Sequence, residues 1–217
     1  MNLTTLIKEY FASAGNDVSI DVFDEKNIYD VYHRVVGMLT QYIDIETTVL
    51  QAMSYCFYEI LDNVLTHSGK EVGTVLTHYD SCNHILNFLV ADDGIGVRAS
   101  LSENEKYADI SEQEALKICI KDTITDGKGM GFGLYSTSLL ARDAGLKFEI
   151  RSCNNMMILQ NGTEVISENK FWQGTIVYLQ LQTNKEINPT EVVANRTNVT
   201  AQYNETFLND KELDALW

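Results

Sequence analysis

The clearest pattern of polar and apolar positions lies in the stretch YEILDNVLTH at 58–67. At about 100° per residue, its polar side chains fall on one side of a helix and its apolar side chains on the other. The polar stripe consists of Glu59, Asp62, Asn63, Thr66 and His67. Either it faces water, as on most surface helices, or it serves a site, because a carboxylate, an amide and an imidazole stand where Lys–Glu pairs are usual.

Similar patterns predict the other elements. Residues 27–40 form a predicted helix, and a longer helix runs from Asp44, as its N-cap, to His67. The runs EVGTVLTHYD and HILNFLVADD predict a β-hairpin. Beyond it, Ser111 and Glu114 form a capping box ahead of a short helix.

The last third of the domain reads as a helix followed by strands. LYSTSLLARDAG predicts a helix that ends at Gly145, and the Asn161-Gly162 pair predicts a tight hairpin turn. Four strand-like runs follow the helix: 146–153, 156–160, 163–167 and 174–182. Neighbouring paired strands predict an α/β fold of the α+β two-layer sandwich type, with a mixed, mostly antiparallel sheet and helices on one face.

Composition and charge narrow the classes of partner. A chain of 217 residues with 45% hydrophobic content can form one domain with terminal segments left over. Its 16 Lys and Arg residues stand against 31 Asp and Glu residues, and the formal net charge is -15. Because binding to a nucleic-acid backbone depends on cations that neutralise phosphates, we expect no nucleic-acid partner.

The sequence shows no sign of a membrane segment or a cysteine-based metal site. The N-terminal run MNLTTLIKEYFASAG carries Lys8 and Glu9 where a signal peptide stays apolar. No run approaches the roughly 18 apolar residues of a membrane span. The four cysteines form no C-x-x-C pair, which favours free thiols in a reducing compartment. We therefore expect a cytoplasmic protein with no membrane partner.

Two glycine clusters indicate a ligand-binding loop: DDGIG at 92–96 and GKGMGFGL at 127–134. In the second, glycine alternates with other residues, so one side of the backbone lacks Cβ atoms and its amides can approach a ligand. A helix follows, and its N-terminal amides favour an anion. The cluster is therefore either a phosphate cradle or simply a flexible loop.

Two familiar phosphate loops do not fit this spacing. A Walker loop needs Ser or Thr after its Gly-Lys pair, but Gly129 follows Lys128. A dinucleotide fingerprint needs glycine at its sixth place, which here falls on Phe132 or Leu134.

The segments EILDNVLTH, DDGIG and GKGMGFGL, in this order, resemble the GHKL superfamily of ATP-binding domains. This superfamily comprises type II topoisomerases, heat-shock chaperones of the ninety-kilodalton class, sensor histidine kinases and mismatch-repair proteins. The resemblance covers about residues 27–182 and implies a Bergerat-type ATP-binding fold. It divides the chain into an N-terminal segment 1–26, a GHKL domain 27–183 with a lid at about 97–128, and a polar C-terminal tail 184–217.

The resemblance implies roles for the polar stripe, which matches the N box. Asn63 matches the asparagine that ligates Mg2+, an ion that prefers oxygen ligands and keeps several waters. Glu59 matches the glutamate that acts as general base or orients the attacking group. His67 would lie near the phosphates and assist catalysis, or else interact only with its helix dipole. Asp62, part of the topoisomerase-like form EILDN, would contact the cofactor.

The glycine clusters take the remaining roles that the resemblance implies. Asp92 matches the aspartate that accepts a hydrogen bond from the exocyclic amine of adenine, and Gly94 and Gly96 shape the adenine pocket. The second cluster matches the box that contacts the phosphates: Lys128, Gly129, Met130, Gly131, Phe132, Gly133 and Leu134. The implied cofactors are ATP and Mg2+, and the lid is expected to order when nucleotide binds.

Within the superfamily, the spacing from Glu59 to His67 is most similar to bacterial anti-sigma factor kinases, which phosphorylate a serine or threonine of a small STAS-domain partner. Histidine autophosphorylation is not expected, since His33 lacks the acidic neighbour usual after a phosphoacceptor histidine. The first hypothesis is therefore an ATP-dependent protein kinase or ATPase that acts on a STAS-domain or sigma-factor-type regulator. The alternative is a stand-alone ATP-gated binding module or ATPase switch with slow turnover. A homodimer is compatible with both.

Overall fold

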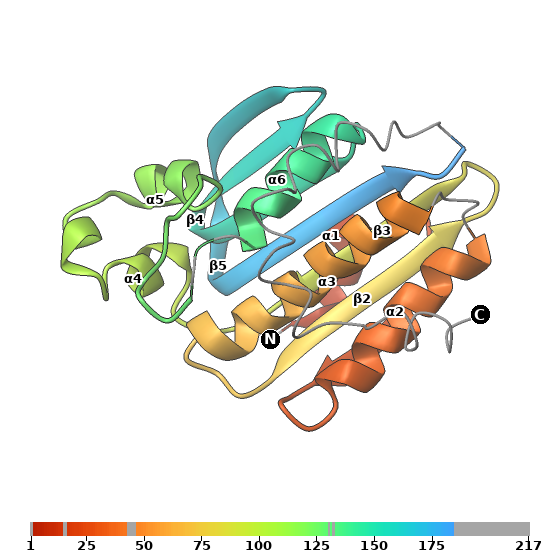
Figure 1. Cartoon of the computed structure of the whole chain (residues 1–217), viewed down its shortest axis with the longest axis horizontal. Helices are drawn as coiled ribbons and strands as arrows, with labels where there is room; N and C mark the ends of the chain where they lie inside the picture. Colours follow the sequence, from red (N-terminus) through yellow and green to blue (C-terminus); the bar gives the residue numbers. More distant parts are fainter. Residues whose placement is uncertain (1, 15–16, 43–46, 130, 132, 185–217) are drawn as a thin grey trace.

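A computed structural model describes residues 2–14, 17–42, 47–129, 131 and 133–184 (Figure 1). Its strands form one five-stranded sheet in the order β1-β2-β3-β5-β4. Every pairing in this sheet is antiparallel, so the described part of the chain has no mixed sheet. The strands are β1 (Ser19–Phe23), β2 (Gly73–Asp80), β3 (Ile85–Ala91), β4 (Lys147–Gln160) and β5 (Thr163–Gln182). The predicted α+β class is confirmed.

Helices cover both faces of the sheet. They are α1 (Leu3–Tyr10), α2 (Ile28–Tyr42), α3 (Thr47–His67), α4 (Val97–Leu101), α5 (Glu112–Ile118), α6 (Gly133–Asp143) and a 3-10 turn, η1 (Glu105–Tyr107). Figure 1 shows α2, α3 and α6 in front of the sheet and α1 behind it. The expectation that the helices lie on one face is therefore wrong, because α1 packs against the opposite face.

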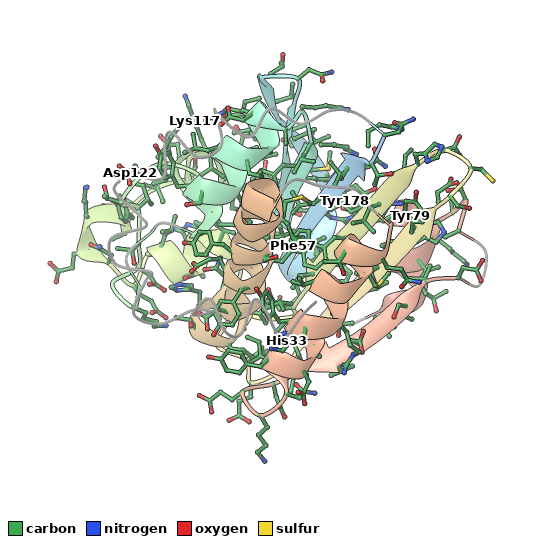
Figure 2. All side chains as sticks on the ribbon, turned by 45° about the vertical axis from the view of Figure 1, so that its right-hand side comes forward. His33, Phe57, Tyr79, Lys117, Asp122 and Tyr178 are labelled. Carbon is green, nitrogen blue, oxygen red and sulfur yellow. The ribbon has the colours of Figure 1, made fainter. Side chains whose placement is uncertain are left out.

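The larger core fills the space between α3 and the front of the sheet. Phe57 of α3, which is labelled in Figure 2, and Phe88 of β3 are both buried. Their rings stack with centroids 4.3 Å apart. Ile60, Leu61 and Val64 continue this apolar face of α3 and are also buried. The predicted two-faced helix thus buries its apolar side, and its polar side remains available for a site.

A second, smaller core lies under α1 on the back of the sheet. Leu6 and Phe11 are buried there against Leu89 of β3 and Tyr178 of β5. Asn2 caps the helix by accepting a hydrogen bond from the backbone N–H of Thr5. Residues 1–26, set apart by the sequence analysis as a terminal segment, therefore contribute α1 and β1 to the same fold.

The last two strands are longer than predicted. The Asn161-Gly162 turn is confirmed, with positive φ angles at both residues. The four short runs merge into β4 and β5, which pair from Lys147–Gln180 to Gln160–Thr163. The pairing is irregular around Cys153, and a bulge inserts extra residues without ending the strand.

Several smaller expectations are also decided. The capping box at Ser111 and Glu114 is present, and α6 ends just before Gly145, whose φ is positive. The proposed N-cap Asp44 and residues 185–217 of the tail lie outside the described residues. Within the described ranges, no helix combines the length and apolar character needed to span a bilayer.

Candidate functional site

One cavity of about 420 Å³ brings together the segments that the sequence analysis singled out. It is bounded by α3, the end of β3, the start of the lid and the glycine loop ahead of α6. The predicted site residues that line it are Glu59, Asp62, Asn63, His67, Asp92, Gly96, Lys128, Gly129, Gly131, Gly133 and Leu134. Met130 and Phe132 lie outside the described residues.

The polar stripe of α3 faces this cavity rather than bulk water. All five of its members line the cavity wall: Glu59, Asp62, Asn63, Thr66 and His67. Within the stripe, the Thr66 hydroxyl donates a hydrogen bond to Asp62 Oδ2 over 3.3 Å. The nitrogen Nδ2 of Asn63 is buried and has no hydrogen-bond partner in the described structure. A buried amide without a partner is unusual, so this nitrogen is available to a polar group in the cavity.

Asp92 closes one end of the cavity. Its Oδ1 accepts hydrogen bonds from the backbone N–H groups of Gly94, at 2.8 Å, and Thr175, at 3.2 Å. Its backbone carbonyl accepts a hydrogen bond from Trp172 Nε1 at 3.0 Å. Burial raises the pKa of the Asp92 carboxyl to about 6, although the two N–H donors act to lower it. The carboxyl is therefore fixed in position and poorly solvated.

Glycines allow the close packing behind Asp92. A Cβ on Gly94 would lie 2.1 Å from the carbonyl oxygen of Ser68, so Gly94 supports the end of α3 and does not itself line the cavity. Gly174 has a φ of +94°, and a Cβ there would lie 2.5 Å from the Asp92 carbonyl oxygen. Only glycine fits these contacts. Gly94 and Gly174 therefore allow the backbone on either side of Asp92 to pack closely.

The glycine loop closes the other end of the cavity. Gly131 has a φ of +76°, and a Cβ there would meet the Ile124 carbonyl oxygen at 2.4 Å. Gly133 begins α6, and a Cβ there would lie 2.6 Å from Glu59 Oε2 and 3.4 Å from Asn63 Nδ2. The start of α6 therefore lies directly against the polar stripe of α3.

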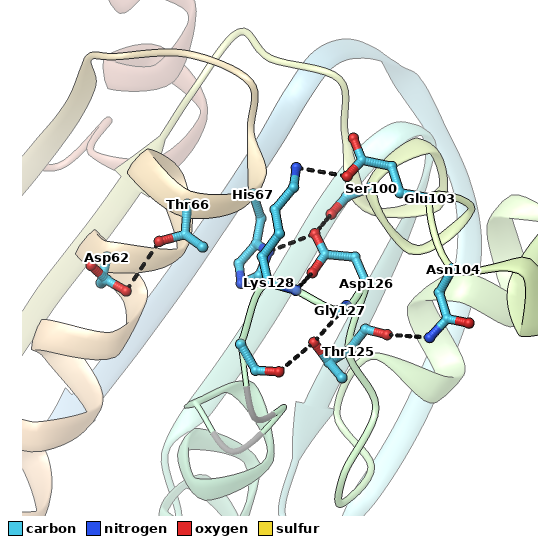
Figure 3. Close-up of polar contacts among 11 residues, drawn as sticks. Asp62, Thr66, His67, Ser100, Glu103, Asn104, Thr125, Asp126, Gly127 and Lys128 are labelled. Atoms are coloured by element: carbon cyan, nitrogen blue, oxygen red, sulfur yellow. Dashed lines mark hydrogen bonds and ion pairs between the residues drawn. The ribbon is translucent and has the colours of Figure 1, made fainter.

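A buried carboxylate connects the loop to α3 (Figure 3). Asp126 Oδ2 lies 2.7 Å from His67 Nδ1 and accepts a hydrogen bond from the Ser100 hydroxyl at 2.9 Å. Asp126 Oδ1 accepts from the backbone N–H of Lys128 at 2.9 Å. Burial acts to raise the pKa of Asp126, but the Lys128, His67 and Ser100 donors outweigh it and lower that pKa.

The Lys128 side chain is engaged outside this carboxylate. Its Nζ forms an ion pair with Glu103 Oε2 at 2.6 Å, and this pairing raises the pKa of Lys128. Both side chains are more than two-fifths exposed, at 42% and 43%. The lysine therefore lies at the rim of the cavity and shares its charge with a lid carboxylate.

No protein-family model matches the chain, and no curated protein matches it in sequence.

The site must therefore be judged on its own donor atoms. The described residues contain no group of three or more His, Cys, Asp or Glu side chains that could hold a metal ion. Mg2+ needs no such group when a ligand supplies phosphate oxygens, since it retains several waters and uses one or two protein oxygens. The side-chain oxygen of Asn63 fits that requirement.

Sequence reasoning missed several residues that complete the cavity. Ser100 donates to Asp126, which contacts His67. Thr175 donates to Asp92, and Gly174 packs against it. The Gly-Thr pair at the start of a strand run and the aspartate just ahead of the glycine loop were visible signals. Their partners lie far away along the chain, however, and no local pattern identifies them.

Proposed function

We propose that this chain is a GHKL-type ATP-binding domain with a Bergerat fold. It binds ATP with Mg2+ in the cavity and transfers the γ-phosphate to a serine or threonine of a partner protein in the cytoplasm. The observation that carries the proposal is that one cavity joins the polar stripe of α3, the buried Asp92 and the glycine loop.

The position of Asp92 at one end of the cavity favours a purine base that carries an exocyclic amine. Both hydrogen bonds to its carboxylate from described residues go to Oδ1. Oδ2 can therefore accept a hydrogen bond from the ligand, and the amino group of adenine is a donor of the right kind. The apolar side chains Val90, Val97 and Val177 line the same cavity and suit the faces of a base.

The start of α6 supports phosphate binding at the other end. This helix has 11 residues, and the glycine loop leads directly into its first turn. Free backbone N–H groups and the helix dipole favour an anion at such a position. Asn63 lies beside this helix end, where it would hold Mg2+ against the phosphates. The ion would neutralise phosphate charge during transfer.

The residues present allow a balanced transfer reaction. The hydroxyl oxygen of the partner forms a bond to the γ-phosphorus while the bond from that phosphorus to the β-γ bridging oxygen breaks and ADP leaves. Glu59 receives the hydroxyl proton as general base. A STAS-domain or sigma-factor-type regulator is the proposed acceptor, on the strength of the Glu59, Asn63 and His67 spacing alone.

One observation favours an ATP-gated binding module with slow turnover instead. The carboxylate of Glu59 lies against the first residue of α6, where a Cβ on Gly133 would come within 2.6 Å of Oε2. A carboxylate packed against the end of another helix is restricted in its approach to an acceptor hydroxyl. In this case ATP would order the lid and create a partner surface without rapid transfer.

Binding and transfer are tested separately. Titration calorimetry with ATP and Mg2+ is expected to give binding for the wild type and for Asp93→Asn, and loss of binding for Asp92→Asn. Asp93 is a matched control because it is adjacent but half exposed, with an ion pair to Lys70 at 3.7 Å. If the wild type does not bind ATP in the presence of Mg2+, the proposed function is wrong.

Transfer is followed with γ-labelled ATP, with and without cell extract. Label on one extract protein that disappears with Glu59→Gln and Asn63→Ala supports the kinase. Free phosphate alone supports an ATPase switch, and binding without turnover supports the gated module.

A further inference from the structure

The contact between His67 and Asp126 fixes the orientation of an imidazole in the cavity wall. His67 is the last residue of α3, and its Nδ1 lies 2.7 Å from Oδ2 of Asp126. The Asp126 side chain is only 1% exposed, whereas that of His67 is 27% exposed and lines the cavity. A buried carboxylate therefore holds a ring that reaches the ligand space.

Asp126 is itself held from two other directions. The Ser100 hydroxyl of α4 donates to the same oxygen as His67, and the Lys128 backbone N–H donates to the other oxygen. Three contacts from separate segments leave the carboxylate little freedom. A group fixed in this way can set the orientation of its neighbour.

This geometry decides which ring nitrogen faces the ligand. Since an ionised carboxylate only accepts hydrogen bonds, Nδ1 of His67 carries a proton toward Asp126. Nε2 then faces the glycine loop, where it lies 3.6 Å from the position of a Cβ on Gly129. The nearby Lys128 ammonium is engaged with Glu103. The remaining charged groups of the α3 stripe in the cavity wall are Glu59 and Asp62, which as ionised carboxylates cannot donate a hydrogen bond to an anion.

We propose that Asp126 is a positioning residue that holds His67 so that the imidazolium form of its ring donates from Nε2–H to the terminal phosphate, which lets the site distinguish a nucleoside triphosphate from a diphosphate. This inference rests on the proposed nucleotide function. It adds that Asp126, a residue of the expected lid, controls the contact between His67 and the phosphate. Asp126 belongs to the loop that leads into the glycine cluster. Discrimination therefore depends on that loop being in place.

The test compares the dissociation constants of ATP and ADP for the full chain. His67→Asn retains a hydrogen-bond donor near the position of Nδ1 and removes Nε2. It therefore keeps the hydrogen bond to Asp126. It is expected to weaken ATP binding about tenfold or more, as for loss of a charge-assisted hydrogen bond, and to leave ADP binding nearly unchanged. Asp126→Asn is expected to reduce the preference for ATP in the same direction. Adding it to His67→Asn is expected to cause little further change.

Asn104→Ala is the matched control, because it removes a hydrogen bond to the Thr125 carbonyl oxygen in the same loop without touching Asp126 or His67. It is expected to retain the wild-type ratio of the two constants. If Asn104→Ala and Asp126→Asn reduce the ratio equally, the role is structural and the proposal is wrong. An unchanged ratio in His67→Asn also overturns it, whereas a wild type that binds neither nucleotide overturns the proposed function itself.

A second readout does not depend on nucleotide. Nitrogen chemical shifts of the His67 ring are expected to show a protonated Nδ1 in the wild type and a changed tautomer balance in Asp126→Asn. An unprotonated Nδ1 in the wild type contradicts the geometry directly.

Discussion

Asp92 combines a proposed binding role with an unfavourable burial. Its pKa is raised from 3.8 to about 6, so the folded protein holds a proton that the unfolded chain releases between these pH values. The free energy of unfolding attributable to Asp92 therefore falls as pH rises through this window, and above about pH 6 the penalty is complete.

Replacing this carboxyl by its neutral amide is expected to stabilise the ligand-free protein. Asp92→Asn can still accept the hydrogen bonds from Gly94 and Thr175 through its side-chain oxygen. Urea unfolding at pH 7.5 is expected to show a gain of about 1–3 kcal/mol, and the gain should shrink toward pH 4. Asp93→Asn, with its exposed carboxyl and lowered pKa, should give no gain. Equal effects from both variants would contradict this account.

Nucleotide binding is expected to depend on pH in the opposite sense. Accepting a hydrogen bond from an amino group is best done by the ionised carboxylate, whose pKa is about 6. ATP affinity is therefore expected to fall as pH drops below about 6. Calorimetric titrations between pH 5 and 8 measure this, with Asp93→Asn as the control that retains the wild-type profile.

Gly174 is expected to tolerate no side chain. Gly174→Ala combines a φ of +94° with a Cβ 2.5 Å from a backbone carbonyl oxygen. A loss of about 2–4 kcal/mol in unfolding free energy is expected. Gly162→Ala separates the two effects, because φ there is also positive, at +73°, but no atom lies within 4 Å. If both variants lose the same amount, the contact with Asp92 is unimportant.

At the scale of elements, α1 holds the back of the sheet with both apolar and charged contacts. Arg151 of β4, whose side chain is 4% exposed, donates to Glu9 at 2.7 Å and to the carbonyl oxygen of Lys170. Tyr10 donates a hydrogen bond to the buried Glu149. The helix is therefore attached through specific partners and not by apolar burial alone.

The apolar part of this attachment is expected to dominate stability. Leu6 has no exposed surface, and Leu6→Ala should lower the unfolding free energy by about 2–4 kcal/mol. Thr4→Ala, at an exposed position on the same helix, should change it by less than about 0.5 kcal/mol. Denaturant melts of the two variants measure the difference. A small effect of Leu6→Ala would mean that α1 is not part of the cooperative fold.

Elements were predictable where their signals are local. The two faces of α3, the capping box at Ser111 and the Asn161-Gly162 turn follow from spacing within a few residues. The placement of α1 could not be predicted in this way. Leu3, Leu6 and Tyr10 have helical spacing, but no local pattern shows that this helix covers the back of the sheet. The continuous β4 and β5 were also missed, since their irregular pairing depends on both strands at once.

The candidate site divides in the same way. The stripe and the glycine clusters were readable as motifs, and the structure brings them to one cavity. The contact between Asp92 and Thr175 spans 83 positions of the sequence, and the contact between His67 and Asp126 spans 59. Contacts of this kind depend on how distant elements are assembled, which local sequence patterns do not specify.

At the scale of the whole molecule, the sheet separates two cores, and Trp172 connects the rear core to the site. Its ring packs in the core under α1, while its Nε1 donates to the Asp92 carbonyl oxygen. Ligand binding at Asp92 is expected to change the fluorescence of this indole. Because Trp217 lies outside the described residues, the measurement uses Trp217→Phe.

In that background, a saturable change with ATP is expected, and it should vanish with Asp92→Asn. A signal that survives Asp92→Asn would show that the ligand binds elsewhere.

The order of strands in the sheet also has a consequence for synthesis of the protein. β5 is the last strand along the described chain, yet it lies between β3 and β4 and supplies Trp172, Gly174 and Thr175 around Asp92. A nascent chain in which α3 and the glycine loop have already left the ribosome still lacks the residues of β5 that pack behind Asp92. A ligand of the Asp92 pocket is therefore expected to stabilise only a chain whose final hairpin has left the ribosome, and not a truncated product.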